Sequence, residues 1–493
     1  MSASAKSTGG GNGAEWKRLL AISAGIGLFA LVHLSPPWPD AVDPSGAHFA
    51  LSREGKAALA VFLLAGIWWV FEVVPIGVTS LAVGALQAFF LIRPAKDAFH
   101  DFMDPSVMFI FASIVVGMVF TKTGLTRRMA FRMLMIVGER TSTILLGCFL
   151  VTAVLTHFMA HTAVAATVYP LLLAVNSLYG EGQRPTRFGK SLFMGMAYVA
   201  GAGSIITLLG AARGAVAISF YRDIIGREIS FFELSWYLFP VGWLMVFLLW
   251  GFFMILLKPE KKVIPGLKER ARQLNAGLGP ITLGEVLAAV IVVCMILAMS
   301  LRSVVPALEH VDKAAIILVS TILFFLLRIL DISDLEDIPW NIVLLFGGAM
   351  SIGVCLYETD AARWLAIQWL TMFQQAHWFA FVMGIAFFVM LMTNFIMNVA
   401  AIAISLPVAL VMAPYLGVAP EVVIFASLVV AGMPFLLLVG AAPNAIAYNS
   451  GQFTSGEFFR FGIPASLLLM AALALAVLVI WPLLGMPITT GGQ

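Results

Sequence analysis

Long apolar runs separated by short polar segments make up most of the chain. The first run covers 19–34, and ten more follow at 57–74, 77–92, 107–122, 191–221, 233–257, 282–300, 314–330, 340–356, 421–449 and 463–484. Most of them approach or exceed the roughly 20 apolar residues that one bilayer crossing requires. The pattern therefore predicts an all-α polytopic membrane protein with about 11 transmembrane helices.

Two other apolar stretches, 143–175 and 377–413, are too long for a single crossing. Neither contains Asp, Glu, Lys or Arg, and polar residues interrupt each one near its middle. Non-helical backbone at membrane depth is tolerated only where it is buried in protein or lines a wet cavity. We therefore expect two re-entrant helical hairpins at these positions.

The distribution of basic residues predicts the orientation in the membrane. The first 18 residues are rich in Gly and Ser and predict a disordered cytoplasmic tail. If both hairpins enter and leave on one side, a cytoplasmic N-terminus places 19 Lys and Arg residues inside and nine outside. This asymmetry satisfies the positive-inside rule and predicts a multi-pass protein of the cell inner (plasma) membrane.

Composition supports this class and excludes others. Hydrophobic residues make up 61% of the 493 residues and charged residues only 11%, whereas a soluble domain has about 25% charged residues. The net charge is +3 and the basic residues form short clusters beside apolar runs, so no nucleic-acid partner is expected. Cys148, Cys294 and Cys355 have no CxxC spacing and are expected to be small buried side chains.

The second half of the chain repeats landmarks of the first at nearly constant spacing. The matched landmarks are 111–113 with 347–349, His161 and Pro170 with Asn398 and Pro407, and 210–212 with 440–442, at offsets of 236, 237 and 230 residues. Five spans plus a hairpin give each repeat an odd number of crossings, so the two repeats must be inverted. Inverted repeats with broken helices indicate a secondary transporter with its substrate near the midplane.

The repeats divide the chain into successive regions. After the tail, the first helix and an outer loop occupy 19–56. The first inverted repeat covers 57–258, a cytoplasmic linker covers 259–281, the second inverted repeat covers 282–485, and a C-terminal tail covers 486–493.

Three polar side chains stand out inside the apolar pattern. A histidine in a membrane segment is costly and usually functional, which favours His161 and, less strongly, His157. Their spacing also allows a metal pair, but no third ligand and no HExxH glutamate accompany them, so no zinc site is expected. Arg213 lies deep in an apolar run and either compensates substrate charge or extends to an interface.

Backbone interruptions follow each hairpin. Glycine-rich segments occur at 201–204 and 207–214, and the sequence Gly440-Ala441-Ala442-Pro443-Asn444 occupies the matching place in the second half. Pro443 lacks a backbone donor, so we expect unwound backbone there. Freed N–H groups and carbonyls at such breaks can bind anions and cations respectively.

Motifs in this order resemble the divalent anion/sodium symporter family, which includes dicarboxylate, citrate and sulfate carriers. Trp68-Trp69 with Glu72, Pro75 and Thr79 is similar to the family's WW..E..P...T motif, Leu344–Gly348 to its LLFGG span, and Ala442–Ile446 to its TPPNAI loop. The resemblance covers about 55–485. It implies an elevator-type transporter that carries small dianions and forms a homodimer.

The resemblance also implies site residues. Family members carry Ser-Asn-Thr at each hairpin tip, where this chain has Ala160-His161-Thr162 and Met397-Asn398-Val399. The first sodium site would correspond to Thr156, Ala160, His161 and Gly210, and it is degenerate here. The second would correspond to Thr393, Ile396, Asn398 and Gly440, so one sodium ion is still expected to bind.

The substrate residues implied in the same way are His161, Thr162, Asn398, Val399 and Ala442, with Arg213 replacing a family proline. Three coupling modes stay open: sodium symport with fewer ions, proton symport through His161, and sodium-independent exchange with His161 and Arg213 in place of sodium. No cofactor other than possible sodium is expected. An anion channel and a membrane-embedded enzyme are remote alternatives, since GxSxG, HExxH and paired intramembrane carboxylates do not occur.

Overall fold

The computed structural model describes residues 13–42, 48–71, 73–179, 184–302, 305, 308, 310–373, 377–395 and 397–490. Over these residues the chain is almost entirely helical, apart from a short antiparallel pair, β1 (Ala41–Val42) and β2 (His48–Phe49). By length and composition, eight helices of the described part could cross a membrane, and five shorter apolar helices accompany them.

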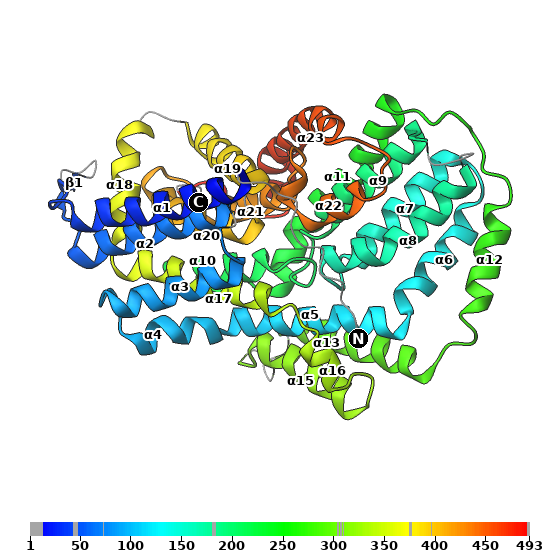
Figure 1. The fold of residues 1–493 in the computed structure, drawn as a ribbon, viewed down its shortest axis with the longest axis horizontal. Helices are drawn as coiled ribbons and strands as arrows, with labels where there is room; N and C mark the ends of the chain where they lie inside the picture. Colours follow the sequence, from blue (N-terminus) through cyan, green and yellow to red (C-terminus); the bar gives the residue numbers. More distant parts are fainter. Residues whose placement is uncertain are drawn as a thin grey trace. The chain divides into compact units, whose positions relative to one another are not determined.

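One compact unit combines residues 1–102 with 340–371. Its helices are α1 (Gly13–Leu34), α2 (Arg53–Val70), α3 (Ile76–Phe89), α4 (Ala95–His100), α17 (Trp340–Glu358) and α18 (Ala361–Phe373), and the 3-10 turn η1 (Asp101–Met103) follows α4. Within this unit α1 packs along α2 and α3 packs along α17 (Figure 1). Buried Arg93 fastens the end of α3 through ion pairs with Asp101 at 2.7 Å and Glu358 at 2.6 Å.

The other compact unit combines residues 103–339 with 372–493. Its first part contains α5 (Pro105–Thr123), α6 (Leu125–Val137), α7 (Thr141–Leu155), α8 (His161–Tyr179), α9 (Arg187–Gly203), α10 (Arg213–Ile225), α11 (Phe231–Leu256), α12 (Leu267–Gly277), α13 (Leu283–Leu301), α15 (Lys313–Leu326) and α16 (Ile332–Glu336). Its last part contains α19 (Trp378–Phe395), α20 (Asn398–Tyr415), α21 (Pro420–Ala431), η2 (Leu438–Gly440), α22 (Ala442–Tyr448), α23 (Ser455–Leu475), a π-helical segment η3 (Ala476–Ile480) and α24 (Trp481–Leu483).

Helix lengths repeat along the chain. α3 and α15 both have 14 residues, α5 and α17 both have 19, and α6 and α18 both have 13. The starts of these pairs lie 237, 235 and 236 residues apart. α3 packs on α17, whereas α5 packs on α15. Each compact unit therefore draws helices from both halves of the chain, while the expected boundaries at 57–258 and 282–485 follow chain order.

Several helices lie where the sequence predicted tail, loop or linker. α1 begins at Gly13, inside the segment 1–18 expected to be a disordered tail. α12 lies in the expected linker 259–281, and α6 lies in a segment expected to be a cytoplasmic loop. α6 carries Arg127, Arg128 and Arg132, so a search for continuous apolar runs passes over it. In the expected C-terminal tail, Thr489 forms a β-bridge with Val418.

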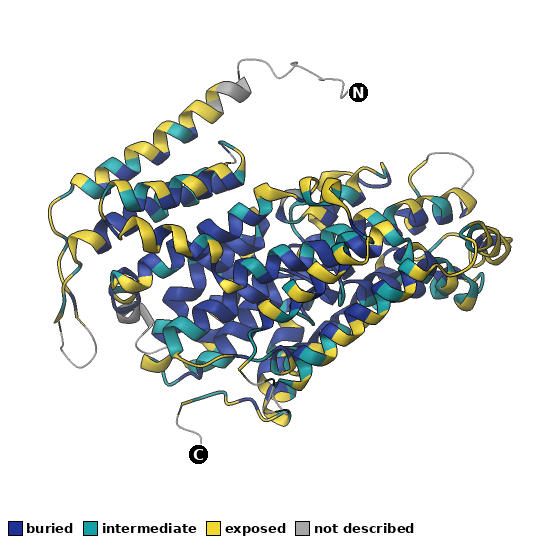
Figure 2. Cartoon of the chain, turned by 90° about the horizontal axis from the view of Figure 1, so that it is seen from below, coloured by how far each residue is buried: buried dark blue, intermediate teal, exposed yellow. Residues whose placement is uncertain are grey.

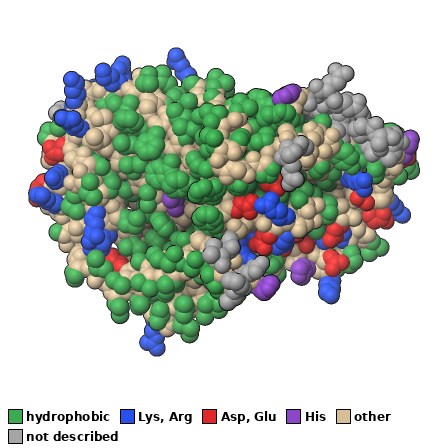
Figure 3. All heavy atoms as spheres, turned by 180° about the vertical axis from the view of Figure 1, so that it is seen from behind, with side chains coloured by type: hydrophobic (Ala, Val, Ile, Leu, Met, Phe, Trp, Pro, Cys, Tyr) green, Lys and Arg blue, Asp and Glu red, His purple; other side chains and the backbone are tan. Residues whose placement is uncertain are grey.

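The outer helices expose large apolar side chains. Ile255 on α11 is 81% exposed and Leu283 on α13 is 73% exposed. Among the candidate spans of the described part, α20 is the most buried and α13 the least. Figure 2 colours the described residues by burial. Hydrophobic side chains cover much of the face drawn in Figure 3. An apolar exterior of this extent is suited to contact with lipid.

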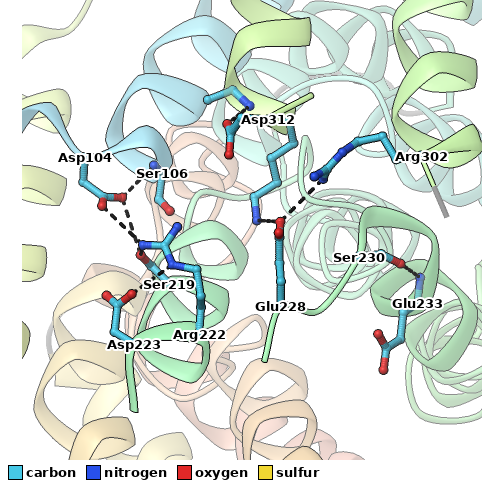
Figure 4. A network of polar contacts seen from close by, with 12 residues as sticks. Asp104, Ser106, Ser219, Arg222, Asp223, Glu228, Ser230, Glu233, Arg302 and Asp312 are labelled. Carbon is cyan, nitrogen blue, oxygen red and sulfur yellow. Dashed lines mark hydrogen bonds and ion pairs between the residues drawn. The ribbon is translucent and has the colours of Figure 1, made fainter. Parts of the chain in front are cut away.

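An ion-pair network fixes the end of α10 inside the second unit (Figure 4). Glu228, in the loop after α10, lies 3.0 Å from Lys313 at the start of α15 and 3.5 Å from Arg302 after α13. Asp104 caps α5 by accepting a hydrogen bond from Ser106 N at 2.7 Å, and it lies 3.5 Å from Arg222 of α10. The network therefore holds the helix that begins at Arg213.

In this network, we expect Glu228 to make the stability of the folded protein depend on pH. Burial raises the pKa of Glu228, but Lys313 and Arg302 outweigh burial and hold the pKa below its ordinary value of 4.5. Because the folded-state pKa is lowered, the stabilisation is complete above the unfolded-state value and is lost as the pH falls through the folded-state value.

We predict that Glu228→Gln lowers the free energy of unfolding by about 1–2 kcal/mol at pH 7, because it leaves Lys313 buried without its partner. Melting of the detergent-solubilised protein at pH 7 and pH 4 measures this, and the variant should show the smaller difference between the two pH values. Glu269→Gln, which alters a solvent-exposed ion pair on α12, is the control. Equal melting of the Glu228 variant and the parent at pH 7 would contradict the assignment.

Candidate functional site

The first hairpin consists of α7 and α8, which are separated by a short non-helical tip at 156–160. α7 ends in tight turns, in which His157 N and Phe158 N donate to carbonyls three residues earlier, each at 3.1 Å. The hydroxyl of Thr156 turns back to the Ala153 carbonyl at 2.6 Å. The chain therefore re-enters a helix at His161, and the predicted hairpin geometry is present.

The first unwound segment lies between α9 and α10, at 204–212. The Gly210 carbonyl accepts a hydrogen bond from His161 N at 3.1 Å, and the His161 ring atom Nδ1 lies 3.4 Å from the same oxygen. A Cβ added to Gly210 would collide with the Thr156 carbonyl oxygen. Thr207 donates its hydroxyl to the His157 carbonyl at 2.8 Å. Tip and segment thus form one interlocked structure.

The second hairpin repeats this arrangement. α19 ends at Phe395 and α20 begins at Asn398, and the fully buried Thr393 hydroxyl lies 3.2 Å from Asn398 Oδ1 and 3.1 Å from the Ala431 carbonyl. A Cβ added to Gly440 would lie 3.0 Å from the Thr393 carbonyl oxygen. The contact between tip threonine and loop glycine therefore recurs in both halves of the chain.

Two asparagines satisfy the backbone of the second unwound segment, at 432–441. Asn394 Oδ1 accepts a hydrogen bond from Leu436 N at 2.8 Å. Asn444 Nδ2 donates to the carbonyls of Pro434 and Leu437 at 2.9 and 3.1 Å. Asn394 was not among the expected site residues, although an asparagine directly after Thr393 in an apolar run was a visible signal.

Arg213 is buried at the start of α10, with only 2% of its surface exposed. One terminal nitrogen, Nη2, donates to Ser204 Oγ at 2.9 Å, whereas Nη1 has no hydrogen-bond partner. Across the described residues, no carboxylate lies within ion-pair distance of Arg213. The guanidinium is therefore a desolvated positive charge that the surrounding protein leaves uncompensated.

The guanidinium of Arg213 also reaches the second unwound segment. A Cβ added to Gly432 would lie 2.5 Å from Arg213 Nη2. A cavity of about 10 Å³ beside it, the size of one water molecule, is lined by residues that include Ser204, Thr207 and Arg213. Arg213 thus lies where the two broken helices meet, and Ser204 is a partner that sequence analysis did not assign.

The remaining expected site residues occupy the tips and the end of the second segment. Thr162 is half-buried as the second residue of α8, and Val399 is buried as the second residue of α20. Ala160 is half-buried at the first tip, and Ala442 is exposed at the start of α22. Ile396 lies outside the described residues. Each tip contacts its own unwound segment, and the described residues show no hydrogen bond between the two tips.

The oxygen atoms differ between the two halves. In the first half, the Gly210 carbonyl already receives the His161 N–H, and Ala160 has no side-chain oxygen. In the second half, Thr393 Oγ1, Asn398 Oδ1 and the Ala431 carbonyl lie together, near the Thr393 carbonyl that faces Gly440. The second group keeps both a threonine hydroxyl and an asparagine oxygen, a set that suits a small monovalent cation at an unwound helix.

Comparisons with known proteins agree with this architecture. The chain is 25% identical over 464 residues to the sodium-dependent dicarboxylate transporter SdcS of Staphylococcus saprophyticus, and the match covers 89% of each chain. It is also 25% identical over 454 residues to SdcS of Staphylococcus aureus strain bovine RF122 / ET3-1, covering 88% of this chain and 87% of the relative.

Two solved transporter structures share the fold at low sequence identity. Neisseria gonorrhoeae MtrF superposes with a TM-score of 0.59 at 12% identity and covers 97% of both chains. The Alcanivorax borkumensis YdaH transporter gives a TM-score of 0.56 at 14% identity, covering 97% of this chain and 98% of its own. The expected all-helical polytopic membrane fold is confirmed.

The family described as "Sodium:sulfate symporter transmembrane region" matches residues 26–487. This match covers nearly the whole chain and confirms the resemblance found in its motifs. The family consists of membrane transporters, so the chain is a transporter and not an enzyme. The protein belongs to the sodium:sulfate symporter family.

Proposed function

We propose that the protein carries small divalent anions, dicarboxylates or related oxyanions, and that Arg213 supplies part of the charge compensation that sodium ions would otherwise provide. The observation that carries this proposal is the buried guanidinium of Arg213, which has an unpartnered nitrogen and lies between two unwound segments. An uncompensated charge in a low-dielectric site is costly, and a dianion bound nearby relieves that cost. The dicarboxylate transport named for the SdcS relatives is consistent with such a substrate.

The anion would be held by donors from both halves of the chain. His161 and Thr162 lie at the start of α8, and Asn398 lies at the start of α20, where helix N-termini favour negative charge. The His161 ring lies beside the Gly210 carbonyl, three residues before Arg213. Protonation of His161 would bring a second positive charge near Arg213, which is unfavourable, so His161 serves best as a neutral hydrogen-bonding group.

Coupling through a single sodium ion follows from the oxygen positions. Thr393, Asn398, Ala431 and Gly440 surround the group of oxygens in the second half. In the first half, His161 occupies the carbonyl that a cation would need. We therefore propose symport with sodium at the second position alone. Cation binding there would favour the arrangement of Asn398 that holds the substrate.

Sodium-independent exchange is the second candidate, and the lack of a carboxylate partner for Arg213 favours it. A fixed cation offsets one of the two negative charges of a bound dianion without any sodium. Such a carrier would need counter-substrate on the far side of the membrane. Uptake that requires preloading with unlabelled substrate and ignores sodium would select exchange over symport.

The proposal also covers the transport motion, the oligomeric state and the orientation in the membrane. We infer an elevator motion that carries the two hairpins across the membrane, in a homodimer with cytoplasmic N-termini. The support for the orientation is the excess of Lys and Arg in the expected cytoplasmic loops. The support for the motion is the interlocking of each hairpin tip with its unwound segment, which allows these parts to move together.

We predict that Arg213→Gln lowers the initial rate of C4-dicarboxylate uptake into proteoliposomes by about tenfold or more, because a charge-assisted contact to the anion is lost. Arg213→Lys should retain part of the rate, since it keeps the charge without the planar fork. Arg272→Gln on the exposed face of α12 is the control. Normal uptake by the Arg213→Gln variant, with unchanged sodium dependence, would refute the role.

A second prediction concerns sodium at the second hairpin. Thr393→Val removes a hydroxyl without changing side-chain volume much, so it should raise the sodium concentration for half-maximal uptake by about fivefold or more. Thr156→Val at the equivalent position of the first hairpin is the matched variant and should leave sodium dependence unchanged. Equal shifts in both variants, or a shift only for Thr156→Val, would show that the sodium site has been placed in the wrong half.

A third prediction concerns His161. Ala160→Ser combined with His161→Asn restores the side-chain oxygens that the family resemblance places at the first tip. The double variant should make uptake depend more steeply on sodium concentration, as the Hill coefficient of initial rates would report. An unchanged coefficient and unchanged pH dependence would mean that His161 does not exclude a cation.

A further inference from the structure

A second cavity lies in the first compact unit, and the transport proposal does not use it. Its volume is about 460 Å³, within the range of small-molecule sites. Arg18 of α1, the turn between α2 and α3, and Asn341 at the start of α17 line it. The other lining residues are Val73, Val74, Pro75 and Ile76.

Hydrogen bonds hold the walls of this cavity in place. Arg18 Nε donates to the Val73 carbonyl at 2.7 Å, which ties α1 to the turn. Gly77 N donates to Asn341 Oδ1 at 2.8 Å, which ties the start of α3 to α17. These bonds use one donor of Arg18 and the oxygen of Asn341. Among the described residues, the terminal nitrogens of Arg18 and the NH2 group of Asn341 have no further hydrogen-bond partner and are left as donors.

The chemistry of the lining selects an amphipathic anion. Its polar side chains, a guanidinium and an amide, offer hydrogen-bond donors, and the guanidinium adds a positive charge that suits a phosphate. The rest of the lining is apolar. A ligand that fits must therefore combine an anionic group with an apolar body.

The position along the helices matches the level of lipid headgroups. Trp16 lies two residues before Arg18 and is 64% exposed, and Trp340 lies next to Asn341 and is 48% exposed. Exposed tryptophans gather at membrane–water interfaces. The Lys and Arg distribution places this end of α1 on the cytoplasmic side, where anionic lipids are attracted by basic residues.

We propose that this cavity binds the headgroup of an anionic phospholipid, with Arg18 and Asn341 as donors to its phosphate and Val73, Val74, Pro75 and Ile76 against its glycerol and upper acyl chains. The bound lipid joins α1, the α2–α3 turn and the start of α17. The site is independent of the transported anion, because all of its residues belong to the first compact unit.

Native mass spectrometry of the purified full-length protein, titrated with phosphatidylglycerol or with phosphatidylcholine of the same chains, tests this proposal. The parent should bind phosphatidylglycerol more tightly. Arg18→Gln should weaken that binding by about fivefold, the effect expected for one basic residue near a headgroup. Arg53→Gln, an exposed arginine at the far end of α2 from Val73, should leave it unchanged.

Asn341→Asp keeps the acceptor for Gly77 N but replaces the free donor by a negative charge, so it should also weaken phosphatidylglycerol binding. This variant decides the question if Arg18→Gln loosens α1 and fails to fold. Binding of phosphatidylglycerol by Asn341→Asp at the parental affinity would overturn the proposal. Competition by water-soluble glycerol phosphate as effective as that of the intact lipid would also overturn it, because the site would then be one for a free phosphate.

Discussion

The buried guanidinium of Arg213, which has no carboxylate partner among the described residues, is the interaction on which the account of the second unit depends. Taking an arginine out of water costs several kcal/mol unless its charge is paired. Among the described residues, the Ser204 hydroxyl is the one hydrogen-bond partner of the terminal nitrogens of Arg213. A protein that serves only its own stability has little reason to retain this residue. In the proposed function, an anion bound near Arg213 would offset this charge, so the cost borne by the empty protein would contribute to affinity for the substrate.

The surrounding helices and unwound segments hold Arg213 in position. α10 begins at Arg213, and the ion pairs of Glu228 and Asp104 hold the region of its other end. Gly432 leaves space for the guanidinium, so the first unwound segment touches the second. The same fold is used twice, yet the two halves differ in one chemical respect. His161 covers the Gly210 carbonyl in the first half, while oxygens stay grouped around Thr393 in the second. In the proposed function, Arg213 would serve as a fixed cation in one half, and the oxygens around Thr393 would bind a sodium ion in the other.

Much of the fold could be predicted from the sequence, because apolar runs and the polar or glycine-rich breaks within them are visible in the local composition. The hairpins and the two unwound segments lie close to where periodicity and spacing placed them. α6 and α12 escaped because charged amphipathic helices give no long apolar run. At the site, His161 and Arg213 stood out as polar residues in apolar surroundings, whereas Thr393 was implied by the family resemblance. Ser204 did not, since a serine beside glycines gains meaning only when the chain folds back on it. Asn394 was visible beside Thr393, but its hydrogen bond to the second unwound segment needs the folded chain.

The most direct test of single-cation coupling is the flux ratio of ²²Na⁺ to a labelled C4-dicarboxylate, measured together in proteoliposomes without preloading. The proposed function predicts a ratio of about one sodium ion per substrate molecule, because Arg213 and His161 would take the place of the first ion and sodium would bind at the oxygens around Thr393. A ratio of two or more would contradict the assignment, since it would require a working cation site at the first hairpin.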